Sequence, residues 1–469
     1  MPAIVFPATS SPGIEAGEHA GRLINAYAEP APAGARGTLR HRRVPGLVEH
    51  ADTTGNRCRG MIEVDDLIYA AFDNRCYKIT EGGTATLLGT LPGTGPVYFA
   101  RNQRTPTPQI YAVAEASEHL VTSTGITQVV LGTRGLSNSV AFLNGYFIVT
   151  RSDGTWGVSA INDVTFSDLD TAAAEGSPDK LVRVIAHKGD ALLFGRKSLE
   201  VWQDVGASPG IPFQRVALKN IGLLSGPAVA GNEPGWADVL IFVASDGSVR
   251  RLDGYEPVRI STHEIDRDIA AVDPTTLEAA VYASRGHFFW ALSSDEWTWV
   301  YDVTGQAWHE RQTYQQARWR ASRSVNAWGG WYAGDRVDGQ IWHITDEAVT
   351  EGDDPLVWDV QSCPMENFPG GLRVGRTEFD MVVGRGVASG TDPIETSPVV
   401  MVSWSDDGGA TFGNEVTRSL GGQGEHKTKV VLFRAGLTGS KGRIWRLRIS
   451  DPVPAVLQAG DMSAEGLSP

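Results

Sequence analysis

The chain has 469 residues, more than a single hydrophobic core usually holds, so we expect one large domain and one smaller domain. Its 54 glycines and 25 prolines favour many short strands and turns, and its net charge of −14 argues against a general nucleic-acid-binding surface, which needs clustered Lys and Arg. The three widely spaced cysteines lack a metal-ligand pattern and no run of about 18 apolar residues occurs, so we expect folding in a reducing cytoplasm without disulfides, metal, cofactor or membrane span.

Residues 1–55 are rich in turn-forming residues and are predicted to be a loop-like arm that packs on the large domain or on a partner. The arm carries a basic cluster that contains Arg40, Arg42 and Arg43. Such a cluster is either a solvated charge run or a contact with an acidic partner. We take these three arginines as candidate partner-interface residues.

Residues 56–350 repeat a pattern of an apolar strand, a tight turn, a second apolar strand, a polar turn and a third strand. The best copy runs from Val140 to Trp156 and contains the turns Asn144-Gly145 and Asp153-Gly154. Both dipeptides supply the positive φ angles that two-residue hairpins require. Each repeat is therefore predicted to be an antiparallel sheet.

The first turns of the repeats are spaced by about 44 residues, the period of β-propeller blades. They fall near Asp66, Pro108, Gly145, Gly189, Asp238, Gly286 and Gly330. We predict a propeller of seven blades, with six as the alternative, and the fourth strand of each blade is inferred because at most three are visible. The tryptophans in these strands indicate packing between blades rather than a ligand cage. The one helical pattern, 265–280, is interrupted by Pro274 and is predicted to connect two blades.

Residues 356–469 form a second block of strands without helices, which predicts a small β-sandwich-like domain. The predicted strands cover 356–360, 377–383, 399–404 and 443–449. The whole chain is therefore expected to be all-β, with a propeller followed by a C-terminal sandwich.

One local motif in the second block resembles the Asp-box hairpin of sialidases and other propellers. It contains Ser405, Asp407, Gly409, Thr411 and Phe412. In those proteins the motif is a structural turn remote from catalysis, and here Asp407 can cap the backbone amides of the turn. A sialidase also needs an arginine cluster, a nucleophile and a general acid, for which the sequence offers only scattered candidates. No nucleotide-binding loop is present either, so we do not expect an enzyme.

Two stretches resemble the packaged-DNA-stabilising proteins, or tail nozzles, of short-tailed bacteriophages. The first comprises residues 21–29 (GRLINAYAE) and 42–47 (RRVPGL), and the second runs from Val402 to Val453. The resemblance implies a virion tail protein, assembled in the host cytoplasm, that forms a hexameric ring below the portal and adaptor. It implies contacts with tail fibre, spike or needle proteins and with genomic DNA that passes through the lumen without sequence-specific binding.

An acidic lumen would let DNA slide, because attraction to every phosphate would hold the duplex in place. We therefore expect acidic residues on the lumen side. The competing hypothesis is a glycan-binding or sialidase-like propeller for host recognition. A pocket with converging arginines and carboxylates at the propeller axis would favour that hypothesis, and a flat surface rich in interfaces would favour the structural one.

Overall fold

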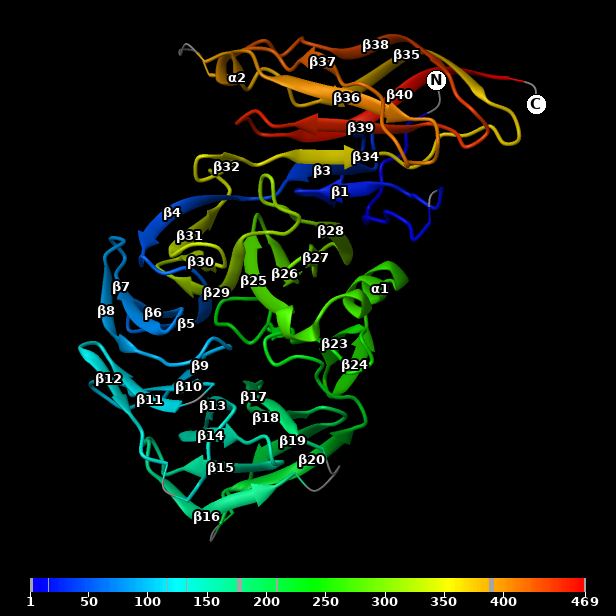
Figure 1. The fold of residues 1–469 in the computed structure, drawn as a ribbon. Helices are drawn as coiled ribbons and strands as arrows, with labels where there is room; N and C mark the ends of the chain where they lie inside the picture. Colours follow the sequence, from blue (N-terminus) through cyan, green and yellow to red (C-terminus); the bar gives the residue numbers. More distant parts are fainter. Residues whose placement is uncertain are drawn as a thin grey trace.

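The computed structural model describes residues 3–15, 17–115, 117–131, 133–174, 179–207, 210–387 and 392–467. A β-propeller is followed in the sequence by a C-terminal β-sandwich, which lies at the top of Figure 1. The described helices are short: α1 (His263–Ala271), the 3₁₀ helix η1 (Pro274–Thr276) and α2 (Pro393–Thr396). The predicted all-β fold with propeller and sandwich is confirmed.

Five separate four-stranded antiparallel sheets follow one another along the chain. Their strands are β5 (Cys58–Val64), β6 (Leu67–Phe72), β7 (Arg75–Ile79), β8 (Ala85–Thr90); β9 (Tyr98–Arg101), β10 (Ile110–Ala114), β11 (Ser117–Thr122), β12 (Gly125–Gln128); β13 (Ser139–Leu143), β14 (Tyr146–Thr150), β15 (Thr155–Ser159), β16 (Phe166–Ala173); β17 (Leu181–His187), β18 (Asp190–Gly195), β19 (Leu199–Asp204), β20 (Phe213–Lys219); and β21 (Val229–Ala230), β22 (Ile241–Val243), β23 (Val249–Asp253), β24 (Glu256–Arg259).

Two further four-stranded units lie within larger sheets. The first consists of β25 (Glu278–Ser284), β26 (His287–Ser293), β27 (Thr298–Asp302) and β28 (Ala307–Glu310). The second consists of β29 (Ala321–Ala327), β30 (Gly330–Asp335), β31 (Gln340–Thr345) and the N-terminal strand β4 (Gly46–Asp52), to which the short strands β32 (Thr350–Glu351) and β33 (Asp354–Pro355) are added. The strand pairing of the described residues therefore favours seven blades over six.

Each predicted first turn falls between the first and second strands of one of these sheets. Four of these turns contain a non-glycine residue with positive φ followed by glycine, namely Asn144-Gly145, Lys188-Gly189, Arg285-Gly286 and Trp328-Gly329. The predicted helical connection is also confirmed, because α1 and η1 lie between β24 and β25.

Ten strands form the sandwich, and three of them come from the N-terminal segment. One sheet has the order β1 (Arg22–Ile24), β34 (Trp358–Gln361), β39 (Ile444–Ile449), β36 (Val399–Ser405), β37 (Val416–Ser419). The other has the order β2 (Ala26–Pro30), β3 (Leu39–Arg43), β40 (Val456–Gly466), β35 (Leu372–Met381), β38 (Val430–Leu437). Trp358, Trp445 and Leu447 of the first sheet share one core with Phe379 and Leu457 of the second.

The N-terminal segment joins the two domains, and the prediction that residues 1–55 are loop-like is wrong. β1 pairs in parallel with β28 of the propeller and antiparallel with β34 of the sandwich, so one nine-stranded sheet runs through both domains. The strands β1 to β4 were missed because their own sequence is punctuated by turn residues and because, apart from the local pairing of β2 with β3, their pairing partners lie hundreds of residues away.

Candidate functional site

The first strands of the blades surround a cavity of about 380 Å³ at the propeller axis. Arg183 on β17 lines this cavity, where its guanidinium lies 4.7 Å from the ring centroid of Tyr98. The guanidinium also donates to the carbonyls of Gly226 and Val229, at 2.8 and 3.3 Å. Arg183 is therefore held against the wall of the cavity.

Two carboxylates that line the cavity are engaged by their own turns. Glu63 accepts a hydrogen bond from the backbone N–H of Asp66 at 2.9 Å, and Glu233 accepts one from Gly231 at 2.6 Å. Desolvation raises the pKa of Glu233. Both carboxylates thus stabilise the backbone beside the cavity.

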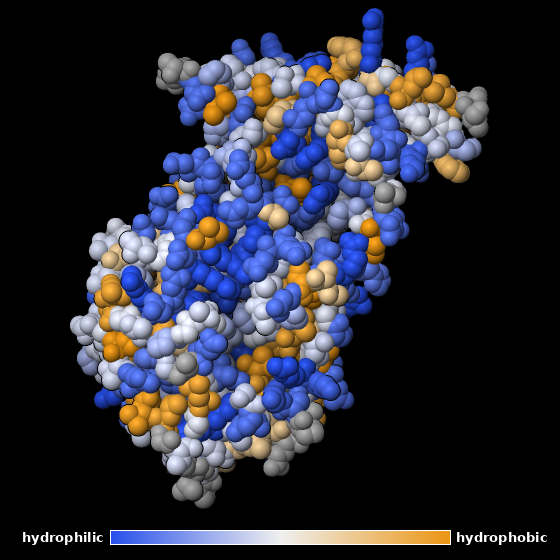
Figure 2. Space-filling view, viewed as in Figure 1, coloured by the Kyte–Doolittle hydropathy of each residue, from blue (hydrophilic) through white to orange (hydrophobic). Residues whose placement is uncertain are grey.

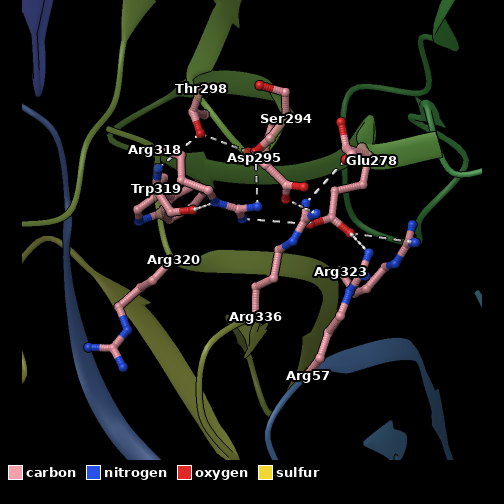
Figure 3. Close-up of polar contacts among 12 residues, drawn as sticks. Arg57, Glu278, Ser294, Asp295, Thr298, Arg318, Trp319, Arg320, Arg323 and Arg336 are labelled. Carbon is pink, nitrogen blue, oxygen red and sulfur yellow. Dashed lines mark hydrogen bonds and ion pairs between the residues drawn. The ribbon is translucent and has the colours of Figure 1, made fainter. Parts of the chain in front are cut away.

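A second cavity of about 440 Å³ shares Arg323 with the first and is also lined by Arg57 and Glu278. Glu278, at the start of β25, is buried with its side chain only 3% exposed. Figure 3 shows four arginines converging on it. The nitrogen-to-oxygen distances are 2.6 Å for Arg336, 3.6 Å for Arg318, 3.6 Å for Arg323 and 4.0 Å for Arg57.

This arrangement keeps Glu278 ionised. Burial alone would raise the pKa of its carboxyl group, but the guanidiniums of Arg323, Arg336, Arg318 and Arg57 outweigh burial and lower the pKa to about 2. Burial lowers the pKa of Arg318 to about 10. The four guanidiniums thus favour the ionised form of Glu278 near neutral pH.

The Asp-box-like residues form a hydrogen-bonded turn after β36. Asp407 accepts from the hydroxyl of Ser405 at 2.6 Å, and from the backbone N–H and hydroxyl of Thr411 at 3.0 and 2.6 Å. The backbone N–H of Gly409 donates to the Ser405 hydroxyl at 2.9 Å. These hydrogen bonds hold the pKa of Asp407 well below its usual value, and the guanidinium of Arg446 lies 5.2 Å from the ring centroid of Phe412.

A buried arginine anchors the same turn from beneath. Arg443 is 1% exposed and makes two 2.8 Å hydrogen bonds to the carboxylate of Asp406. It also donates to the carbonyl of Ala435 at 2.6 Å. The turn is therefore fixed to the sandwich, and its carboxylates are occupied by intrachain contacts.

Two family models match consecutive parts of the chain. Residues 21–349 match the model described as "Bacteriophage P22 Gp10, beta-propeller", and residues 360–465 match "Bacteriophage P22 Gp10, beta-sandwich". The chain belongs to the bacteriophage P22 Gp10 family. No curated protein matches it significantly.

Solved structures that resemble this P22 Gp10 family member are propellers of low sequence identity. A streptogramin B lyase has a TM-score of 0.45 and 10% identity, and covers 64% of this chain and 97% of its own. A virginiamycin B lyase from Staphylococcus aureus has a TM-score of 0.46 and 11% identity, and the match covers 64% of this chain and 98% of the lyase. The WD40 propeller domain of Doa1 has a TM-score of 0.40 and 11% identity, and the match covers 64% of this chain and 97% of the Doa1 domain. At this identity the likeness concerns the fold alone.

The first stretch that resembles tail nozzles lies where the two domains of this P22 Gp10 family member meet, and the second, from Val402 to Val453, lies within the sandwich. Residues 21–29 span β1 and most of β2, and residues 42–47 connect β3 to β4. Arg43 is buried there and donates to the carbonyls of Val453 at 2.7 Å, Ile449 at 2.9 Å and Asp451 at 3.1 Å.

The structure thus places Arg43 within the chain rather than on a free partner surface, because β40 and the preceding loop cover it. Arg42 forms a 2.5 Å ion pair with Glu29 of the neighbouring strand β2. Arg40 is half-buried on the same strand, so a partner contact stays a prediction for Arg40.

Sequence reasoning missed the arginines around Glu278. Arg57 lies just before β5 of the first blade, and Glu278 begins β25 of the sixth. In the seventh blade, Arg323 lies in β29 and Arg336 directly follows β30, whereas Arg318 lies in the loop before β29. No local motif marks residues that come together only when the ring of blades closes. Arg443 was missed as well, although it follows the Asp-box-like turn that it anchors.

Proposed function

We propose that this protein is a tail nozzle component that forms a hexameric ring below the portal and adaptor, retains the packaged DNA and lines its exit channel. This proposal rests mainly on the match of both domains, in chain order, to the P22 Gp10 family models over residues 21–349 and 360–465. Membership of that family makes the chain a structural protein of a phage tail. The ring, the DNA retention and the channel are the further steps proposed here.

Two physical features support a ring role. The nine-stranded sheet that includes β28, β1 and β34 ties the propeller to the sandwich, so each copy can act as one rigid wedge. A closed ring needs two complementary flanks on every copy, which a large two-domain chain can offer. On the face seen in Figure 2, apolar residues form small separate groups within a largely hydrophilic surface.

The net charge of −14 supports passage of DNA without adhesion. We propose that acidic residues face the lumen, where they would repel the phosphates and let the duplex slide. The proposed partners are the portal and adaptor proteins, and tail fibre, spike or needle proteins. No helix in the described part of the chain has the length and apolar character needed to cross a bilayer.

A non-enzymatic role agrees with the chemistry at the axis. Glu63 and Glu233 accept hydrogen bonds from their own turns, and Glu278 is held ionised by four arginines. General acid–base catalysis needs one group that holds a proton and another that accepts one near the same substrate. Each of these carboxylates is engaged by groups of its own chain, which favours a structural role.

Particles produced without this protein test the proposal directly. We expect heads that package DNA but fail to retain it, measured as genome-length DNA that becomes accessible to nuclease after packaging. Supplying the wild-type protein during assembly should restore protection. Full nuclease protection without the protein would contradict the DNA-retention role.

The arginines at the axis favour one second candidate, a glycan-binding or sialidase-like propeller. Arg57 and Arg323 line a cavity there together with carboxylates. Incubation of the purified protein with sialosides, with release of free sialic acid as the readout, tests this candidate. Turnover that Arg323→Gln abolishes would support it, and the absence of both binding and turnover would remove it.

A further inference from the structure

The arginine cluster around Glu278 carries more positive charge than its carboxylates neutralise. Four arginines surround Glu278, and Asp295 adds one further carboxylate, which pairs with Arg336. Since Asp295 is 61% exposed, much of its charge is screened by water. The cluster therefore has a positive excess at the edge of a cavity.

Two of these guanidiniums face the cavity without a hydrogen-bond acceptor among the described residues. Arg323 and Arg57 each contact only the Oε2 atom of Glu278, at 3.6 and 4.0 Å, which is beyond hydrogen-bond distance. The buried Nε atom of Arg323 has no partner. An unsatisfied buried guanidinium is costly, so an acceptor at this place would be stabilising.

The backbone of β29 directs Arg323 to this position. The register between β29 and β30 shifts between Ser322 and Ser324, which makes Arg323 the extra residue of a β-bulge, and its φ is +45°. Bulges redirect side chains, and a positive φ at a residue other than glycine costs free energy. Arg323 is thus held toward the cavity at the expense of a strained backbone.

The other charged residues that line the cavity are already paired. Glu115 accepts hydrogen bonds from the backbone N–H groups of Thr94 and Gly95, both at 3.0 Å. Arg59 donates to the carbonyls of Gly95, Asp73 and Leu91. Only Arg57 and Arg323 retain free donors toward the space between them.

We propose that the cavity at Arg57 and Arg323 binds a small inorganic oxyanion, such as phosphate or sulfate. The planar donors of two guanidiniums match the acceptor oxygens of such an ion. The ion would lie between the segment that leads from β4 to the first blade and β29, the first strand of the seventh blade, and would link Arg57 of the segment to Arg323 of the strand. Oxyanion binding would therefore stabilise the closed ring of blades, independently of the tail function.

Calorimetric titration of the full-length protein with sodium phosphate, against sodium chloride at equal ionic strength, tests the site. We expect saturable phosphate binding and a rise in melting temperature that chloride does not produce. Arg323→Gln should weaken binding at least tenfold, whereas Arg373→Gln, a 69% exposed arginine of the sandwich, should leave it unchanged. Equal effects of phosphate and chloride, or unchanged binding by Arg323→Gln, would overturn the proposal.

Two further measurements keep the test decisive if Arg323→Gln folds poorly. Arg57→Gln changes a 43% exposed side chain and should also weaken binding at least tenfold; unchanged binding contradicts the site. Wild-type crystals soaked in selenate should show an anomalous peak within hydrogen-bond distance of Arg57 and Arg323, and the lack of a peak there overturns the proposal. Stronger binding of N-acetylneuraminate than of phosphate at these arginines would likewise reject an inorganic ligand.

Discussion

Buried arginines that donate to backbone carbonyls recur where strands of this protein end. Arg59 donates to a carbonyl of the loop between β8 and β9, Arg43 to one of the loop before β40, and Arg443 to one near the end of β38. Each replaces hydrogen bonds that the irregular backbone cannot make with a neighbouring strand. None of these roles is visible in the sequence, because the residues around an arginine do not show whether its donors face solvent or backbone carbonyls.

Arg43→Met should destabilise the protein. The substitution leaves the buried carbonyls of Val453 and Ile449 without their donor, and each unsatisfied carbonyl costs about 1–3 kcal/mol. Relief of the buried charge offsets part of this cost. We expect a loss of about 2 kcal/mol in the free energy of unfolding, measured by denaturant titration. Arg36→Met, at a 74% exposed side chain, is the control and should stay within about 0.5 kcal/mol. Equal stability of both variants would contradict the role of Arg43.

His287 should make stability fall as pH rises through neutrality. Its Nδ1 atom lies 2.7 Å from the carboxylate of Asp302, which raises the pKa of the imidazole, and Glu29 also faces the ring at 3.9 Å. Because the folded pKa lies above the unfolded value of about 6.5, the stabilisation is complete below that pH and is lost as pH rises through the folded pKa.

The comparison of His287→Gln with wild type isolates this contribution. Between about pH 6 and pH 9 the melting temperature of the wild type should fall relative to that of the variant. His309, whose pKa is lowered by burial, titrates in the opposite sense but is present in both proteins. A constant difference in melting temperature over this range would contradict the assignment.

At the scale of elements, the sequence predicted the inner strands of the blades better than the outer ones. Second strands such as β10 and β18 are buried along their whole length, which gives an apolar run that is easy to recognise. Fourth strands such as β8 and β24 are largely exposed and polar, so they resemble loops. The strands of the N-terminal segment were missed for a different reason. β1 and β4 pair only with distant strands, and β2 and β3 form a hairpin across a stretch rich in turn residues.

The closure of the seventh blade by β4 makes a clear prediction. Leu47 is 1% exposed and pairs with Ile344 of β31, whereas the next residue, Val48, is 45% exposed on the other face of the same strand. Leu47→Ala should cost about 2–5 kcal/mol of unfolding free energy, as large-to-small changes in cores do. Val48→Ala should cost less than about 1 kcal/mol. Thermal unfolding of both variants provides the measurement, and similar losses would contradict closure of the blade by β4.

At the scale of the whole molecule, the succession of propeller and sandwich follows from repeat spacing and from the change in pattern near residue 355. What composition and spacing could not show is how the domains are joined, since β1 contributes to a sheet that spans both. The tail function rests on family membership, because the axial residues alone are compatible with a ligand site. Assembly into a ring involves several copies, and a single chain contributes only the surfaces that would contact its neighbours.

The copy number in an assembled complex tests the central claim most directly. The purified protein would be mixed with the portal and adaptor assembly, and the complex would be measured by mass photometry and imaged by negative stain. We predict six copies bound as a closed ring on the adaptor side. A protein that stays monomeric and does not bind the assembly, or a ring with another copy number, would contradict the account.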